Sequence, residues 1–210
     1  MSDLPVMPAR DAYARWADIY DSNDNATRDA DAALLRAQDL PLDGAQVVEF
    51  GAGTGKNTAY LAQHATRVTA IDFSPAMLDK ARTRVRAPHV TFIEHNITQR
   101  WPLDDASADV IVGNLVLEHI HDLDTVMAQI RRVLRAGGVV WMCELHPFRQ
   151  LAGAQAKFET AQGTQMVEAY VHSVSEYVNA ALAAGLALEN MVEYSDADGR
   201  PRLLGLRLRG

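Results

Sequence analysis

Apolar positions along the chain change their period in a regular way. Between residues 46 and 143, short apolar runs of strand length alternate with segments of helical period, as in parallel strands joined by crossover helices. The strands expected here are residues 46–50, 67–71, 90–94, 108–113 and 138–143. The pattern therefore predicts a parallel α/β sheet through most of the chain.

Two further apolar runs, residues 186–194 and 202–209, close the chain. The segment Asp196-Ala-Asp-Gly199 between them has the residues of a tight turn, which predicts an antiparallel hairpin. With these runs the expected fold is α/β: a doubly wound, Rossmann-like seven-stranded sheet, mostly parallel with an antiparallel last hairpin, with helices on both faces.

Capping residues mark several helix ends. Ser74 followed by Pro75 predicts an N-cap with proline in the first turn. Ser173 with Glu176 predicts a capping box that opens a helix reaching about residue 184. Gly137 follows an arginine-rich segment, which predicts the C-terminal end of a helix at this glycine.

Two helices are expected before the first strand, separated by short polar residues at 22–25. The apolar face of the first, over residues 10–20, consists of Tyr13, Trp16, Ala17 and Tyr20. The inner face of the second is expected to consist of Ala30, Ala33, Leu34 and Ala37.

Length and composition indicate a single globular domain. The chain has 210 residues, of which 48% are hydrophobic and 22% charged, a balance that is typical of folded proteins and excludes disorder. We expect one domain of residues 1–210, in which residues 1–40 form a helical cap over a ligand site. Residues 147–172 show no clear period and are expected to form a substrate loop.

Charge and hydropathy limit the classes of partner that we expect for this chain. Twenty basic against 27 acidic residues leave a net charge of −7, which disfavours nucleic acid. Residues 1–10 lack the apolar run of a secretory signal, and no stretch reaches the roughly 18 apolar residues of a membrane span. We expect a cytoplasmic monomer or homodimer without a membrane partner. The single cysteine, Cys143, is expected to be buried and inert.

The segment Val47-Val-Glu-Phe-Gly51-Ala-Gly53-Thr-Gly55 predicts a strand that runs into a glycine turn and then a helix. Alternate glycines let a backbone bend tightly against a ligand. A phosphate-binding P-loop is excluded, because Phe50 and Asn57 stand where it needs glycine and Ser or Thr. A dinucleotide site is disfavoured, because Lys56 stands where its third glycine belongs.

This glycine segment closely resembles the Glu-x-Gly-x-Gly-x-Gly motif of the class I S-adenosylmethionine-dependent methyltransferases. Val68-Thr-Ala-Ile-Asp72-Phe-Ser-Pro-Ala-Met77 resembles the ribose-binding segment of that family, Asn114-Leu-Val-Leu-Glu118-His119 the loop after its fourth strand, and Val133-Leu-Arg-Ala-Gly137-Gly138 the turn into its fifth. The similarity covers about residues 13–146, and it is closest to the small-molecule branch typified by ubiquinone and menaquinone biosynthesis methyltransferases.

The resemblance implies S-adenosylmethionine as the cofactor, S-adenosylhomocysteine as its product, and no metal. A carboxylate at Asp72 can accept both hydrogen bonds of a ribose diol, and Asn96 stands where the family usually has an aspartate for the adenine amino group. The expected cofactor-binding residues are Tyr20, Glu49, Gly51, Ala52, Gly53, Asp72, Phe73, Met77, Asn96, Ile97, Asn114 and Leu115.

A base would assist methylation of an acidic acceptor. By the strand period of two, Glu144 and His146 share one face at the carboxyl end of the fifth strand. His146 is the first candidate base, with His119 and Glu144 as further catalytic candidates. The expected substrate-binding residues are Tyr13, Trp16, His119, His146 and Tyr170.

The run Glu118-His-Ile-His-Asp122 has ligand types that zinc or iron accept, but it is interpreted as a polar loop entering a helix capped by Asp122. The expected function is methyl transfer to a small molecule, an aromatic or heteroaromatic metabolite. The alternatives are a non-catalytic S-adenosylmethionine-binding protein and an NAD-dependent oxidoreductase; a macromolecule methyltransferase is less favoured, because no Asn-Pro-Pro-Tyr follows the fourth strand.

Overall fold

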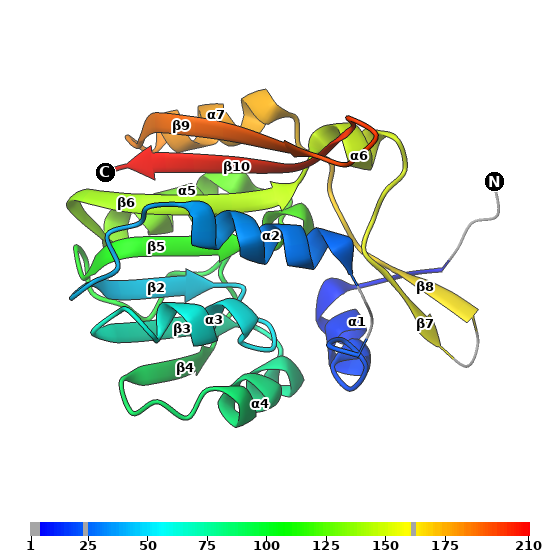
Figure 1. Cartoon of the computed structure of the whole chain (residues 1–210), viewed down its shortest axis with the longest axis horizontal. Coiled ribbons are helices and arrows are strands. Elements are labelled where there is room, and N and C mark those ends of the chain that lie inside the picture. Colours follow the sequence, from blue (N-terminus) through cyan, green and yellow to red (C-terminus); the bar gives the residue numbers. More distant parts are fainter. Residues whose placement is uncertain (1–4, 23–24, 161–162) are drawn as a thin grey trace.

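The computed structural model describes residues 5–22, 25–160 and 163–210. A seven-stranded sheet in the order β4-β3-β2-β5-β6-β10-β9 forms its centre (Figure 1). The strands are β2 (Gln46–Phe50), β3 (Arg67–Asp72), β4 (Val90–Glu94), β5 (Ala108–Asn114), β6 (Leu134–Leu145), β9 (Ala187–Ser195) and β10 (Pro201–Arg209). β10 pairs antiparallel with both β6 and β9, whereas the other pairs are parallel. The predicted fold class and the closing hairpin are confirmed.

The sheet reverses its direction of growth at β2, which pairs with β3 on one side and with β5 on the other. The chain first builds outward through β3 to β4 and then returns to place β5 beside β2. The turns after β2 and β5 therefore diverge at the carboxyl edge of the sheet. Ligands of open α/β sheets bind at such a switch point.

Helices cover both faces of the sheet, as predicted. One core lies under α5 (Leu123–Val133) and α7 (Val174–Ala183), and the other lies under α2 (Ala26–Ala37) and α3 (Lys56–Leu61). α4 (Pro75–Arg84) connects β3 to β4. Side chains alternate between the two faces along β2, so that Phe50 packs into the first core and Val47 into the second.

Two predicted helix starts are confirmed. The Ser74 hydroxyl accepts from the Met77 amide at the start of α4, and Ser173 with Glu176 forms the capping box of α7. The predicted stop at Gly137 is wrong: α5 ends at Val133 and β6 begins at the next residue. Gly137 does adopt a positive φ of 74°, but it does so near the shifted register between β5 and β6.

The two N-terminal helices differ from expectation in detail. α1 (Ala9–Trp16) ends at Trp16, although the predicted aromatic face stays together beyond it. In α2 the predicted inner face is half confirmed: Ala30 is buried and Leu34 packs against the core, but Ala33 and Ala37 are exposed. Asp31 and Leu35 are buried instead. A charged side chain on an inward face is opposite to the apolar pattern used for the prediction. Asn23 and Asp24 of the predicted break lie outside the described residues.

Residues 147–172 are more regular than predicted. They contain α6 (Pro147–Leu151) and the strands β7 (Lys157–Thr160) and β8 (Gly163–Val167). β8 pairs with β7 and with β1 (Val6–Met7), which makes a second, three-stranded sheet. This small sheet and α1 lie beyond the carboxyl ends of the parallel strands (Figure 1). Trp16 and Phe158 stack at 5.2 Å between them, so the two segments form one cap.

The described part of the chain contains no helix that is both long and apolar enough to cross a membrane. Cys143 is buried in β6, as predicted, and burial raises the pKa of its thiol well above the usual value.

Gly113 of β5 is a position where packing requires glycine. A Cβ added there would lie 1.9 Å from Cζ of Phe50, and overpacked cores lose about 1–3 kcal/mol. We expect Gly113→Ala to lower the free energy of unfolding by about this amount, measured by urea denaturation. Because the Phe50 ring causes the clash, Gly113→Ala with Phe50→Leu should lose less stability than the sum of the single variants. Strict additivity would contradict this packing.

Candidate functional site

The turn after β2 consists of glycines with left-handed backbone. Gly51, Gly53 and Gly55 have φ values of 71°, 53° and 78°, a region that glycine adopts without strain. A Cβ at Gly51 would lie 2.7 Å from Cβ of Val116, in the loop after β5. In that loop Leu115 has a positive φ of 54°, which is rare for a side chain of this kind. The two loops of the switch point are therefore pressed together at strained or glycine-only positions.

Asp72, at the end of β3, holds the glycine turn. Its Oδ2 accepts from the Gly53 amide at 2.8 Å and its Oδ1 accepts from the Ser74 amide at 2.9 Å. The side chain is 5% exposed, and burial raises its pKa while these backbone donors oppose the rise. Each carboxylate oxygen has a second lone pair, so Asp72 can still accept hydrogen bonds from a ligand.

A cavity of about 580 Å³ opens beside this carboxylate, within the 300–1,000 Å³ that is usual for small-molecule sites. Phe73, Met77 and Ile97 supply apolar lining, and Tyr13 and His119 also line the cavity. The cap thus contributes Tyr13 to a cavity whose floor is the carboxyl edge of the sheet.

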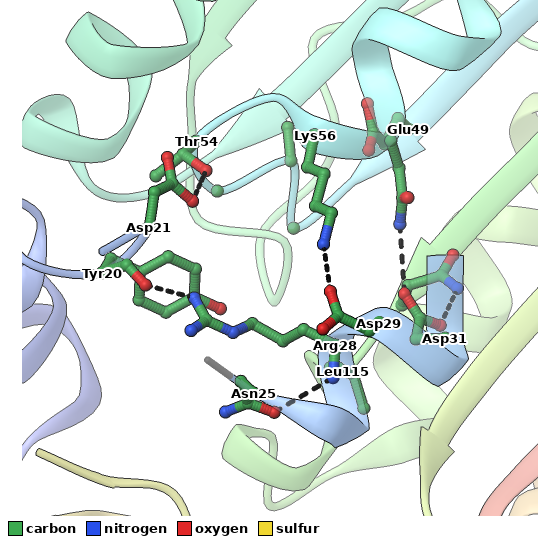
Figure 2. A pocket seen from close by; sticks show the side chains of 15 residues that line it. Tyr20, Asp21, Asn25, Arg28, Asp29, Asp31, Glu49, Thr54, Lys56 and Leu115 are labelled. Carbon is green, nitrogen blue, oxygen red and sulfur yellow. Dashed lines mark hydrogen bonds and ion pairs between the residues drawn. The ribbon is translucent and has the colours of Figure 1, made fainter. Parts of the chain in front are cut away.

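A smaller cavity of about 190 Å³ adjoins the glycine turn, and Figure 2 shows side chains that line it. The two cavities share Tyr20, Gly51, Gly53, Asn114 and Leu115 as lining, so they meet at the turn. A single elongated ligand could therefore occupy both.

Hydrogen-bond acceptors converge on the smaller cavity. Asp31 accepts from the side-chain amides of Asn57, at 3.2 Å, and Asn114. The side-chain oxygens of these two asparagines are buried and have no hydrogen-bond partner among the described residues. Glu49 accepts from Thr58 Oγ1 at 2.5 Å. Such a set of acceptors fits a positively charged, hydrogen-bond-donating group.

Two basic side chains lie at the same cavity. Lys56 Nζ pairs with Asp29 Oδ1 at 2.7 Å. The Arg28 guanidinium lies 4.1 Å from the centre of the Tyr20 ring and donates to the Tyr20 carbonyl at 2.5 Å. Acidic and basic groups facing one small volume suit a zwitterion such as an amino acid.

Comparison with known proteins finds chains that are similar to this one. Residues 48–142, from β2 to β6, match a methyltransferase domain. The chain is 36% identical over 129 residues to a malonyl-[acyl-carrier protein] O-methyltransferase of Serratia marcescens, covering 61% of this chain and 49% of the relative. These similarities support a class I S-adenosylmethionine-dependent methyltransferase. A demethylmenaquinone methyltransferase of Tropheryma whipplei is 36% identical over 115 residues, or 52% of this chain and 46% of the relative.

Solved structures share the fold. A putative S-adenosylmethionine-dependent methyltransferase of Listeria monocytogenes superimposes with a TM-score of 0.74 at 19% identity, over 87% of this chain and 98% of the other. A DhpI–SAH complex superimposes with a TM-score of 0.75 at 24% identity, over 96% and 94%. The chain spans about half the length of the first curated relatives that it matches, so their activities remain proposals for this chain.

All twelve cofactor-binding residues predicted from the family motifs line one or both cavities. Glu49 and Ala52 line the smaller cavity; Asp72, Phe73, Met77, Asn96 and Ile97 line the larger; and Tyr20, Gly51, Gly53, Asn114 and Leu115 line both.

Asn96 differs from expectation in its hydrogen bonding. Its Oδ1 accepts from both the amide and the hydroxyl of Thr98, at 3.0 and 2.9 Å. These two bonds use both lone pairs of the amide oxygen, so the expected acceptance from an adenine amino group is not supported by this geometry.

The first candidate base, His146, lies outside the lining of both cavities. Its Nδ1 accepts from the Phe148 amide at 3.0 Å as the N-cap of α6, and its Nε2 lies 2.9 Å from Glu193 Oε1 in β9. The prediction extended the strand period one residue too far, because β6 ends at Leu145 and the chain then turns into α6. The placement of His146 therefore contradicts a role as the base or in substrate binding.

Three further candidates also lie away from the cavities. Glu144 Oε1 accepts from the amides of Val116 and Leu117 at 3.2 and 3.1 Å, and burial raises its pKa well above the usual value. Glu144 therefore stabilises the loop after β5 by accepting hydrogen bonds from its backbone. Trp16 is 6% exposed within the core of the cap, and the Tyr170 hydroxyl donates to Glu168 Oε1 at 3.2 Å.

His119 and Tyr13 are brought together, as the sequence could not show. Tyr13 Oη lies 2.8 Å from His119 Nε2, and His119 Nδ1 lies 2.6 Å from the Glu168 carbonyl. Both side chains line the larger cavity. The contact joins α1, the loop after β5 and the chain after β8.

Sequence reasoning missed Arg28, Asp31, Lys56 and Asn57. Asp31 and Arg28 lie on α2, far in sequence from every family motif. The one available signal was an aspartate beside the apolar positions of a helix, which ordinarily marks a solvated edge.

The buried carboxyl group of Glu49 is expected to make the stability of the protein depend on pH. Burial raises its pKa to about 8 from 4.5, so the native state holds a proton that the unfolded state releases. The stability contributed by this group is complete below about pH 4.5 and is lost as the pH rises through about 8. Glu49→Gln cannot ionise, and we expect its stability relative to wild type to rise between pH 6 and pH 9 in thermal unfolding without ligand. The exposed Glu159→Gln is the control, and a Glu49→Gln difference that is constant with pH would contradict the prediction.

Proposed function

We propose that this chain transfers a methyl group from S-adenosylmethionine to a small-molecule acceptor and leaves S-adenosylhomocysteine. The observation that supports this proposal most directly is the pair of cavities that meet at the glycine turn. One lies beside the Asp72 carboxylate, and the other is lined by acceptor oxygens that have no partner among the residues that the structure describes. A nucleoside joined to an amino acid matches that division.

Residue roles follow from the chemistry of each cavity. In the larger one, Asp72 would accept from the ribose diol, and Met77 with Ile97 would pack on the adenine. In the smaller one, Asp31 and Glu49 with the side-chain oxygens of Asn57 and Asn114 would receive the ammonium group. Arg28 and Lys56 would face the carboxylate.

The bound cofactor supplies a methyl carbon that is already electrophilic because it is attached to a sulfonium. The protein then has to hold an acceptor atom in line, at about 3–3.5 Å, and to exclude water. Tyr13 and His119 lie in the cavity wall for this purpose, with Tyr13 supplied by the cap. We expect no metal to be needed, and turnover should be insensitive to chelators.

The acceptor is proposed to be a small aromatic or heteroaromatic molecule. Tyr13, Tyr20, Phe73 and His119 give the larger cavity an aromatic lining, which suits stacking against a planar ring. Arg10, the one arginine among its described lining residues, is already paired with Glu94 at 3.1 Å. A neutral acceptor therefore suits this cavity better than an anionic one.

The similarity to malonyl-[acyl-carrier protein] O-methyltransferases raises a second candidate, methylation of a carrier-bound carboxylate. The described lining of the larger cavity has a single arginine, Arg10, and this arginine forms an ion pair with Glu94. The net charge of −7 would also repel an acidic carrier. These observations favour the free small molecule.

Ligand-induced thermal shifts test the cofactor assignment. S-adenosylmethionine and S-adenosylhomocysteine should raise the unfolding temperature, since a ligand at 100 times its Kd stabilises by about 2.7 kcal/mol. NAD and ATP are the matched comparisons. A rise with NAD alone would favour an oxidoreductase. Cofactor binding without release of S-adenosylhomocysteine across a panel of phenols, amines and malonyl-carrier protein would indicate a binding protein.

Replacing Asp72 tests the nucleoside side of the site. Asp72→Ala removes acceptors for the ribose diol and loosens the glycine turn, so S-adenosylhomocysteine should bind about 1–3 kcal/mol more weakly by calorimetry. Asp79→Ala on the exposed side of α4, which breaks a surface pair with Arg82, is the control. Unchanged affinity in Asp72→Ala would rule out this role.

A further inference from the structure

The contact between Tyr13 and His119 has a defined direction. A carbonyl oxygen only accepts, so the 2.6 Å contact with the Glu168 carbonyl places a proton on Nδ1 of His119. In the neutral ring Nε2 is then an acceptor, and the Tyr13 hydroxyl donates to it at 2.8 Å. The lone pairs of the Tyr13 oxygen are left for a donor in the cavity.

A buried carboxyl group stands behind this pair. Glu118 Oε1 lies 3.7 Å from His119 Nε2, and the two side chains are 7% and 5% exposed. Glu118 Oε2 accepts from Gln150 Nε2 at 3.3 Å. Burial raises the pKa of Glu118 and the neighbouring His119 opposes that rise, so a positive charge on the ring would favour the ionised carboxylate.

Titratable groups act on the pair of Tyr13 and His119 from several packed elements. Tyr13 comes from α1, Glu118 from the 3-10 turn Leu117–His119 itself, and Glu144 from β6. Tyr20 contributes a second phenol and Asp72 of β3 a further carboxyl group, and both act on Tyr13 as well. Burial raises the pKa of Tyr13 well above its usual value, so its hydroxyl gives up its proton only when another donor supplies a proton in its place.

We propose that the acceptor is a neutral hydroxyl compound of phenol or enol type, whose proton passes through the Tyr13 hydroxyl to His119, with buried Glu118 as the counter-charge. The inference rests on the proposed function and names its acceptor class. Tyr13 is the group that touches the acceptor, and His119 and Glu118 act through it.

The step balances without another reactant. The acceptor O–H proton moves to the Tyr13 oxygen as the Tyr13 proton moves to His119 Nε2. The acceptor oxygen forms the new bond to the methyl carbon as the carbon–sulfur bond breaks, and the electron pair of that bond stays on sulfur. The imidazolium loses its extra proton to water after the products leave.

The relay indicates an O–H acceptor because such a group must lose its proton before or during methyl transfer. A neutral amine can be methylated first and lose a proton afterwards. A carboxylate has no proton to lose and would call for a cationic partner, which the paired Arg10 does not supply. A proton acceptor already aligned in the cavity wall is therefore most useful to a phenol or an enol.

Ionisation of 4-nitrophenol tests the relay without knowledge of the natural acceptor. The probe is added to the complex with S-adenosylhomocysteine at a pH below its own pKa in solution, so that no methyl transfer occurs. Calorimetry measures its binding, and the visible band of its phenolate measures proton transfer. We expect the bound probe to be largely phenolate in the wild-type protein.

Three variants separate the parts of the relay. Tyr13→Phe keeps the ring packing but breaks the path, and His119→Gln removes the proton acceptor; each should lower the bound phenolate fraction by about tenfold or more. Glu118→Gln should lower it less and leave His119 protonated on Nδ1, read from nitrogen-15 chemical shifts. Tyr194→Phe on β9 removes an exposed hydroxyl far from the cavities and should have no effect.

The outcomes are distinct. Phenolate in wild type that is lost in Tyr13→Phe and His119→Gln supports the relay. A probe that binds as the neutral phenol, or that fails to bind the complex, overturns it, and so does phenolate that persists in Tyr13→Phe. An unchanged phenolate fraction in Glu118→Gln overturns the counter-charge. Failure of S-adenosylhomocysteine itself to bind would instead overturn the proposed function.

Discussion

The hydrogen bonds that Asp72 accepts from the backbone connect the sheet to the ligand site. One carboxylate at the end of β3 holds the Gly53 amide in the turn after β2 and the Ser74 amide at the start of α4. The same group faces the larger cavity. The turn, the start of α4 and the cavity wall therefore share one anchor, and the left-handed glycines are stable because this anchor offsets the flexibility of their backbone.

Several buried carboxyl groups lie around the site. Glu49, Asp72, Asp31, Glu118 and Glu144 surround the carboxyl edge of the sheet, and burial raises the pKa of each. Desolvated carboxyl groups favour a positive charge nearby. A ligand with an ammonium and a sulfonium group would meet that preference at the centre of the molecule, whereas the surface carboxylates of Asp18, Asp29 and Asp196 have their pKa lowered by basic partners.

The cap links the N-terminus to a segment more than 140 residues away. β1 pairs with β8, Trp16 stacks on Phe158, and the chain after β8 supplies the carbonyl that orients His119. Ion pairs join the same cap to the sheet domain, from Asp18 to Lys80 and from Asp21 to Arg84. The orientation of a cavity side chain thus depends on two distant parts of the chain.

Local patterns were enough to establish the sheet, the closing hairpin, two helix caps and the residues around the glycine turn. The sheet, hairpin and caps depend on periods of two and 3.6 and on capping residues a few positions apart, so the sequence carries them directly. The residues around the glycine turn were predicted from the family motifs. The placement of His146, Asp31, Tyr13 and His119 depended on tertiary structure. β6 ends one residue before His146, so the side chain of His146 does not follow the strand alternation. Asp31 is stabilised on the inward face of α2 by hydrogen bonds from the side-chain amides of Asn57 and Asn114. The pairing of Tyr13 with His119 joins residues 106 positions apart, and no local period encodes a contact over such a separation.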